Sequence, residues 1–144
     1  MALDRSFVEL NRASTTRMRE LVMRLTNDGL LKPVGKGWKV YTALAHMAFW
    51  DLRVMDILDK TEREGKLVAP EIDISVNDIL STLFGAMQPR LISQIAFQTA
   101  EALDGMLGAF PPGLLLQVYA RNERWIVRAL HRNSHLDAID AALL

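Results

Sequence analysis

Four long stretches of this chain carry apolar residues at three- and four-residue spacing, and no stretch alternates apolar and polar residues long enough to form a convincing strand. A three- and four-residue spacing places the apolar side chains on one face of a helix, which can then pack against a neighbour. The sequence therefore predicts an all-α fold. The four stretches run from Leu3 to about Asn27, from about Lys39 to Arg63, from Pro89 to about Leu107, and from about Leu114 to Ala142.

Glycine and proline mark where these helices are expected to end. Gly29 follows Asn27 and Asp28 and suits a left-handed cap for the first helix, and the segment LKPVGKG after it reads as a loop. Gly65 closes the charged tail of the second helix, and Pro70 disfavours helix in the segment that follows. The run GAFPPG separates the third helix from the fourth.

About 20 residues, from Lys66 to Gln88, connect the second helix to the third. This is too long for a tight turn between antiparallel helices. Within it the run SVND at 75–78 has the form of a capping box and predicts a short helix over Val76 to Gly85. We therefore expect a four-helix bundle in which this crossover leaves helices two and three parallel.

Size and charge narrow the class of protein. A chain of 144 residues fits a single domain, residues 1–144, with a proper core. Lys plus Arg and Asp plus Glu are both 17, which gives no support for a nucleic-acid partner. With no cysteine, disulfides and thiolate ligands are excluded. The N-terminal run MALDRSFVELNRAS does not resemble a signal peptide and no run suits a membrane span, so we expect a cytoplasmic protein without a membrane partner.

The chain has three histidines, and their spacing is informative. His131 and His135 lie four residues apart, so on a helix their side chains share one face and can reach one metal ion. His46 belongs to the apolar stripe that contains Trp50 and Val54, so it points toward the core. A third histidine from another helix would complete a three-nitrogen site that leaves a coordination position open.

Two interpretations of the histidines stay open from the residues alone. Each could be a core histidine satisfied by a hydroxyl or carbonyl group, or the three could form one metal site. The spacing also matches part of the H-E-x-x-H pattern of zinc proteases, but Arg132, Asn133 and Ser134 stand between the two histidines. The catalytic glutamate of that motif is missing, which excludes that peptidase mechanism.

Four further residues are candidates for the walls of a pocket near the histidines. Trp50, one turn beyond His46, could form a wall or serve as a core aromatic residue. Arg124 could reach a substrate carboxylate or lie on the surface. Gln98 could line a cavity or face solvent, and Thr42 could hydrogen-bond near the site or bond back to its own helix.

Residues 37–51, GWKVYTALAHMAFWD, resemble the G-W … L-A-H … W-D segment of the DinB/YfiT-like superfamily, which includes the N-terminal domains of mycothiol-dependent maleylpyruvate isomerases. The pair His131 and His135 is similar to the second metal element of that family, and Asn77 lies where its members often place an asparagine. The resemblance follows the order of elements along nearly the whole chain. Lys39 departs from it, because the family usually has a Ser or Thr helix cap there.

The resemblance implies an up-down-down-up four-helix bundle and a divalent metal, zinc or nickel, held by His46, His131 and His135. It also implies a homodimer and thiol chemistry on a small molecule, with a low-molecular-weight thiol as partner. The larger isomerases carry a C-terminal domain that this sequence does not match, so activity specific to the two-domain arrangement is not expected.

Three functions follow as hypotheses. The first is a metal-dependent thiol transferase or isomerase. The second is a non-catalytic metal- or ligand-binding bundle, such as a stress-related accessory protein. Apart from the three, a metal-free helical interaction module is a separate and weaker hypothesis. The third, a metal-dependent hydrolase, needs a general base, and no Asp or Glu falls on the stripe of His131 and His135; Asp51 and Glu123 are not expected to point inward.

Overall fold

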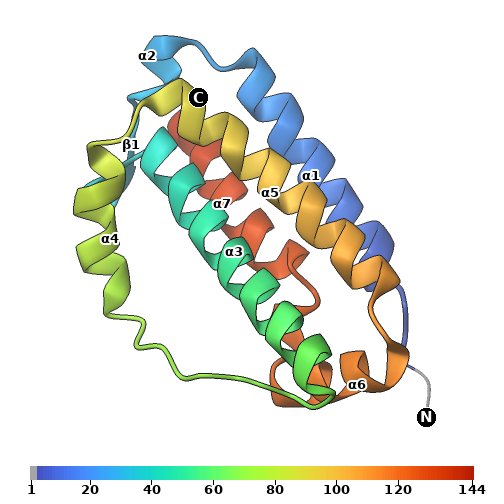
Figure 1. Ribbon diagram of the computed structural model, residues 1–144. Helices are drawn as coiled ribbons and strands as arrows, with labels where there is room; N and C mark the ends of the chain where they lie inside the picture. The colour runs from blue at the N-terminus through green and yellow to red at the C-terminus, as the bar shows by residue number, and fades with distance from the viewer. Residues whose placement is uncertain (1–2) are drawn as a thin grey trace.

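The computed structural model describes residues 3–144 and is helical apart from one small two-stranded sheet (Figure 1). The all-α prediction is confirmed. The helices are α1 (Phe7–Arg24), α2 (Asn27–Leu30), α3 (Val40–Glu64), α4 (Val76–Gly85), α5 (Pro89–Ala109), α6 (Pro112–Arg121) and α7 (Ala129–Ala142). A single 3-10 turn, η1 (Glu123–Trp125), precedes α7, and the antiparallel strands are β1 (Pro33–Gly35) and β2 (Trp38–Lys39).

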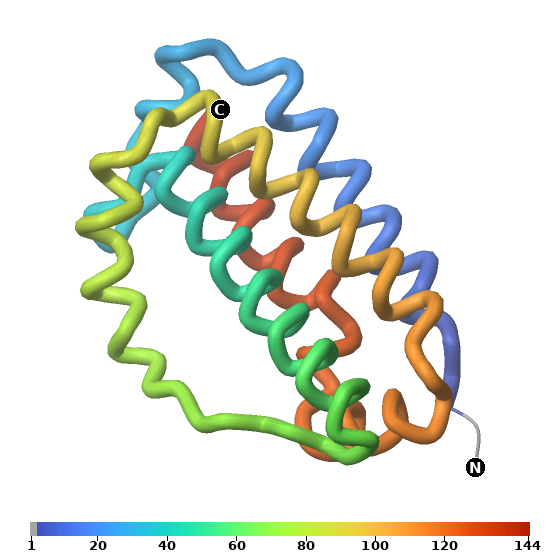
Figure 2. Tube along the Cα trace, viewed as in Figure 1, coloured from blue at the N-terminus to red at the C-terminus, as the bar shows by residue number. Residues whose placement is uncertain are grey.

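The four long helices α1, α3, α5 and α7 pack along one another (Figure 2). After α3 the chain crosses one side of the molecule in an extended segment and then forms α4 (Figure 2). The hydroxyl group of Tyr41, at the start of α3, donates a 2.7 Å hydrogen bond to the carbonyl of Gly85, at the end of α4. The connection therefore returns the chain to the end at which α3 began, and α5 starts there.

Two apolar clusters form the core, one toward each end of the long helices. Leu44 and Met47 of α3 belong to the first cluster, and Leu58 of α3 with Leu103 of α5 to the second, all fully buried. Each such side chain stabilises the fold by roughly 1.5–3 kcal/mol relative to an exposed one. Between the two clusters along α3 lies Asp51, a fully buried carboxylate. A polar layer therefore divides the core.

Several helix ends agree with the sequence. As predicted, α3 ends at Gly65 and Pro89 occupies the first turn of α5; Gly65 takes the left-handed conformation with φ 70°. The short helix α4 has the predicted bounds. Its start is stabilised differently from the prediction, because the Ser75 side chain makes no cap hydrogen bond and the Asp73 carboxylate instead accepts from the Ser75 backbone N–H.

The single last helix predicted from Leu114 to Ala142 is wrong. The chain leaves the helix at Asn122, whose φ of −164° is extended and whose side chain accepts a hydrogen bond from the Arg124 backbone N–H. The chain re-enters a helix only at Ala129. An asparagine that caps its own turn competes with the helix, so α6 and α7 are separate elements and share no continuous stripe.

The predicted cap at Gly29 and the predicted loop after it are also wrong. Gly29 lies inside α2, where its backbone N–H donates to the Thr26 side chain. The segment LKPVGKG forms the first strand and turn of the β1–β2 hairpin, and Lys36 adopts a positive φ of 57° between two glycines with positive φ. The strands are too short to show an alternating pattern in the sequence.

Within residues 3–144, no helix combines the length and apolar character needed to cross a membrane.

Candidate metal centre

The three histidines of the chain come together between α3 and α7. His46 projects from α3, and His131 and His135 project from α7. One ring nitrogen from each histidine lies within 4.8 Å of one ring nitrogen from each of the other two, and Nε2 of His46 is 3.2 Å from Nε2 of His131. One ion could therefore contact all three rings, as the sequence predicts for a three-nitrogen site.

Local structure explains how the rings meet. The four-residue spacing on α7 holds the ring centroids of His131 and His135 4.7 Å apart, and His46 is 4.6 Å from His135. Trp38 of β2 closes one side, with its ring centroid 4.8 Å from His46 and 6.2 Å from His135. The hairpin that sequence reasoning missed thus supplies a wall of the centre.

Burial and neighbouring cations keep the three rings uncharged. Burial first, and then His135, Lys36 and Arg128, lower the pKa of His46 to about 3. Burial and Arg128 lower the pKa of His131 to about 2, and burial with Lys36 lowers that of His135. Neutral imidazole is the form that binds a metal, so all three rings are in the ligating form at neutral pH.

A chain of two hydrogen bonds, from Arg128 to His131 and from His131 to His46, decides which ring nitrogen carries the hydrogen in these two histidines. Nη2 of Arg128 lies 3.2 Å from Nδ1 of His131. A guanidinium can only donate, so Nδ1 accepts and the neutral His131 ring carries its hydrogen on Nε2. That hydrogen then points to Nε2 of His46, 3.2 Å away. In a metal-binding histidine, the ring nitrogen that does not hold the metal usually donates its hydrogen to an acceptor. A metal at Nε2 of His131 would therefore require the contact between Nδ1 and the Arg128 guanidinium to change.

Directly beside the histidines lies a buried ionic network centred on Asp51. Its carboxylate accepts 2.8 Å and 3.1 Å hydrogen bonds from Nε of Arg128 and Nε of Arg132. Arg132 also donates 2.9 Å to Asp104 of α5 and 3.0 Å to Thr15 of α1. The network joins all four long helices with two arginines and two aspartates, so its charges balance.

The sequence-based expectation that Asp51 does not point inward is wrong. It is fully buried because two arginines of the α7 segment surround it. Arg128 and Arg132 were not recognised as buried residues either. Their four-residue spacing places them on one helical face, next to the apolar residue Ala129, and this could have marked a charged stripe that points inward. Asp51 is no candidate for a free general base, because both of its oxygens already accept from guanidinium groups.

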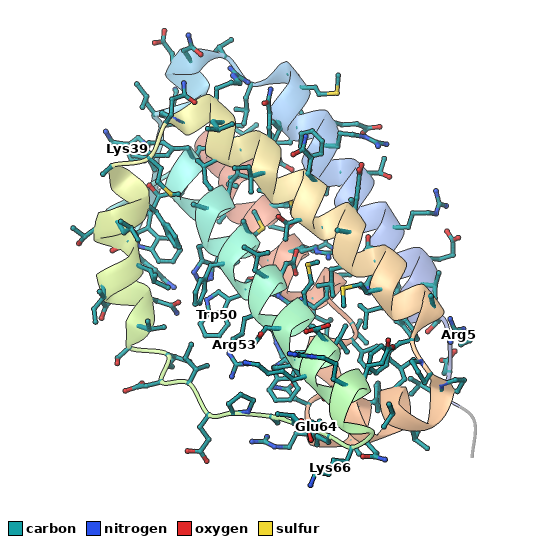
Figure 3. The ribbon with its side chains drawn as sticks, in the orientation of Figure 1. Arg5, Lys39, Trp50, Arg53, Glu64 and Lys66 are labelled. Atoms are coloured by element: carbon teal, nitrogen blue, oxygen red, sulfur yellow. The ribbon has the colours of Figure 1, made fainter. Side chains whose placement is uncertain are left out.

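A cavity of about 270 Å³ opens beside the histidines. His46 and His131 form part of its wall, together with residues of α3, the crossover segment and the η1 region. Nε1 of Trp50 donates a 2.9 Å hydrogen bond to the side chain of Asn77, which ties α3 to α4 across this cavity. Figure 3 shows Trp50 and Arg53 projecting from α3 toward the crossover segment.

The structure brings two of the four candidate pocket residues to this cavity. Trp50 and Arg124 both line it. Thr42 is buried one turn before His46 but lines a separate hollow beside Trp38 and Ser81. Of the two alternatives for Gln98, the structure shows the second: Gln98 is exposed on α5, while its neighbours Thr99 and Ala100 face the core.

Comparison with protein-family models, with curated proteins and with solved structures finds no match for this chain.

Proposed function

We propose that His46, His131 and His135 bind one divalent metal ion, zinc or nickel, and that this ion serves a reaction on a small molecule. The observation that carries the proposal is that three ring nitrogens, one from each histidine, lie within 4.8 Å of one another. They come from two different helices, and His46 and His131 are 85 residues apart in the sequence. Three uncharged imidazoles are a donor set that zinc and nickel accept.

The residues fit such an ion in charge and in access. Three neutral ligands leave the charge of a divalent ion intact and leave a position open for a substrate. The cavity beside His46 and His131 gives that position a route to the outside. Core histidines with purely structural roles would have no need of an adjoining cavity.

We further propose that the chain belongs with the DinB/YfiT-like proteins and has their four-helix bundle with up-down-down-up topology. The packing of the four long helices supports this, and so does a crossover that returns the chain to the start of α3. The motif residues His46, Trp50 and Asn77, which carry the resemblance, all line the cavity.

Among reactions, we favour thiol transfer or thiol-dependent isomerisation. A divalent ion at the histidines would supply a Lewis acid that favours the ionised form of a bound thiol. The chain itself supplies a partly apolar cavity and the hydrogen-bonded pair Trp50 and Asn77 in its wall. This chemistry needs no protein carboxylate, and no Asp or Glu among residues 3–144 lines the cavity.

That same observation separates the proposal from a hydrolase. Activation of water is usually assisted by a general base at the metal, and here the nearest buried carboxylate, Asp51, is held by two arginines. The second candidate function is a non-catalytic metal-binding bundle in which the ion joins α3 to α7. The ring contacts between these two helices favour it equally.

Metal content decides whether the site exists. Purified protein, stripped with chelator and then equilibrated with zinc or nickel, should bind one ion per chain. His46→Ala and His135→Ala should each lose at least tenfold in affinity, while Glu20→Ala, on the exposed face of α1, should bind as the wild type does. Equal metal content in the wild type and in His46→Ala would contradict the shared site.

Catalysis needs a separate assay. Thiol addition to a small electrophile should be followed with several common low-molecular-weight thiols, using metal-loaded and chelated protein. A rate that requires both the metal and His46 supports the enzyme. Stoichiometric metal binding with no such rate favours the non-catalytic bundle.

We also propose that the chain forms a homodimer. Ile79 and Leu83, one helical turn apart on α4, are 72% and 61% exposed and form an uncovered apolar face. Light scattering coupled to gel filtration should give twice the chain mass. Ile79→Glu should shift the protein toward the monomer if this face is the interface.

A further inference from the structure

We propose that the cavity beside the histidines binds a small organic carboxylate, with Arg53 and Arg124 holding the carboxylate and Trp50 and Trp125 enclosing its apolar body. The inference rests on the proposed function only in placing the ligand next to a metal. The binding itself is a property of this chain's own residues.

Charge is the first reason. Three guanidinium groups, those of Arg53, Arg124 and Arg128, line the cavity, and no carboxylate of residues 3–144 does. Arg128 is neutralised by Asp51, with which it forms a buried ion pair. Arg53 and Arg124 form no ion pair within the described part of the chain. Two uncompensated cations beside uncharged histidines favour an anion.

An unsatisfied donor on Arg53 is the second reason. Its Nη2 donates to the carbonyl of Pro70, which anchors the crossover segment. Its Nη1 is buried and has no hydrogen-bond partner, the only such side-chain atom found in residues 3–144. A buried donor left without a partner is costly, and a ligand oxygen would satisfy it once the Arg53 side chain turns toward the cavity that this residue lines.

The remaining wall selects the rest of the ligand. Trp50, Trp125, Val54 and Ile74 contribute apolar surface to the cavity. A guanidinium matches the planar two-oxygen geometry of a carboxylate, and indole rings suit a flat or aliphatic body. With about 270 Å³ available, the ligand has the size of a small metabolite.

A neighbouring hollow adds to the specificity. It shares Trp50, Arg53 and Trp125 with the cavity but also carries Glu71 and Asp73 of the crossover segment, together with Arg121 at the end of α6. A ligand that extended into this hollow with a second negative group would meet these carboxylates. Such a group gains little there, and phosphate has no apolar body to fill the indole-lined wall of the cavity, so the arrangement favours an organic monocarboxylate.

The test uses benzoate and its uncharged isostere benzamide, added to chelated, metal-free protein. Tryptophan fluorescence reports binding, since two of the three tryptophans of the chain line the cavity. Benzoate should bind at least tenfold more tightly than benzamide. Arg124→Gln should weaken benzoate at least fivefold while leaving benzamide unchanged, and Arg53→Gln should do the same.

The matched control is Arg63→Gln, which removes an exposed arginine from the end of the same helix as Arg53 and should leave benzoate binding unchanged. Arg124 makes no side-chain hydrogen bond in residues 3–144, so its variant tests the proposal even if Arg53→Gln fails to fold. Equal affinity for benzoate and benzamide, or inorganic phosphate that binds as tightly as benzoate, would overturn the proposal.

The outcome is separable from that of the metal site. Two results would support the two proposals independently: His46→Ala loses metal binding, and wild-type protein binds benzoate equally well with and without chelator. Benzoate that binds only to metal-loaded protein, and equally in Arg124→Gln, would place the anion on the metal and overturn the arginine site while leaving the metal proposal intact.

Discussion

Helices α3 and α7 meet at two adjacent polar clusters. They differ in charge and in whether all of their polar groups already have partners within the protein. In one, the carboxylate of Asp51 is surrounded by Arg128 and Arg132, and its hydrogen bonds extend to α1 and α5. In the other, His46 faces His131 and His135 with no carboxylate, and a cavity opens at its side. The first is a closed set of charges, and the second is a set of neutral donors left open to a ligand.

The comparison separates a structural role from a binding role. A buried ion pair whose partners are all satisfied contributes order to the fold and offers nothing to a ligand. Three imidazoles held uncharged by burial are in the protonation state that a metal binds, although Nδ1 of His131 accepts from Arg128. Arg128 belongs to both clusters, because it donates to Asp51 through Nε and to His131 through Nη2. The network thus also orients the histidine site.

Breaking the ionic network should give the largest effect on stability. Asp51→Ala leaves the buried guanidinium of Arg128 without its counter-ion and leaves Arg132 with Asp104 alone, which should lower the free energy of unfolding by about 3–5 kcal/mol. Urea unfolding followed by circular dichroism measures it. Asp56→Ala, an exposed partner of Lys60 on the same helix, should change stability by less than about 1 kcal/mol.

If Asp51→Ala does not fold, Asp51→Asn keeps one acceptor and remains measurable. A wild-type stability in either variant would show that water or another group replaces the carboxylate. The network would then not be the closed cluster described above.

Zinc should have the next largest effect on stability, and it should act only through the three histidines. At a zinc concentration 100 times the dissociation constant, the wild type should gain about 2.7 kcal/mol of stability, on the order of 10 °C in Tm. His131→Gln should gain almost nothing. Magnesium serves as the control ion, because it prefers oxygen ligands and should not stabilise either protein. Equal stabilisation by both metals would indicate binding at surface carboxylates.

The sequence predicted the open cluster far better than the closed one. A four-residue spacing of His131 and His135 and a motif around His46 are visible without a structure. Asp51, Arg128 and Arg132 were hidden because charged residues are normally exposed, and only the approach of α7 to α3 buries them. The break at Asn122 was hidden in the same way, since it depends on a local side-chain hydrogen bond rather than on periodicity.

The two clusters should also differ in their response to acid. His46 has a pKa lowered to about 3 in the folded chain and an ordinary pKa of about 6.5 when unfolded, so the unfolded state takes up its proton first. Stability is therefore lost as the pH falls below about 6.5. Between pH 7 and pH 5, metal-free wild type should lose roughly 1–2 kcal/mol more than His46→Gln, after allowance for solvent at the open side.

Urea unfolding at the two pH values, in the presence of chelator, measures this difference. Asp56→Ala is a suitable control, because the carboxylate is exposed and the histidines are unchanged, so it should follow the wild type over the same pH range. Parallel losses in the wild type and His46→Gln would mean that the folded chain admits a proton at His46 as readily as the unfolded chain does.

The smallest effect should come from the residue that joins the clusters. Arg128 places a positive charge beside the proposed metal and donates to Nδ1 of His131, which holds the hydrogen of that ring on the nitrogen that faces His46. Both effects oppose metal binding. Arg128→Gln should therefore raise zinc affinity about fivefold, or about 1 kcal/mol, while it lowers the stability of the metal-free protein.

Calorimetric titration measures the change in zinc affinity, at a temperature where circular dichroism shows that the variant is folded. Arg124→Gln removes a nearby charge without touching a histidine, so the difference between the two variants isolates the hydrogen bond to His131 from the general electric field. A zinc affinity in Arg128→Gln at or below that of the wild type would mean that the arginine supports the ligand instead of restraining it, and the two clusters would then act as one site.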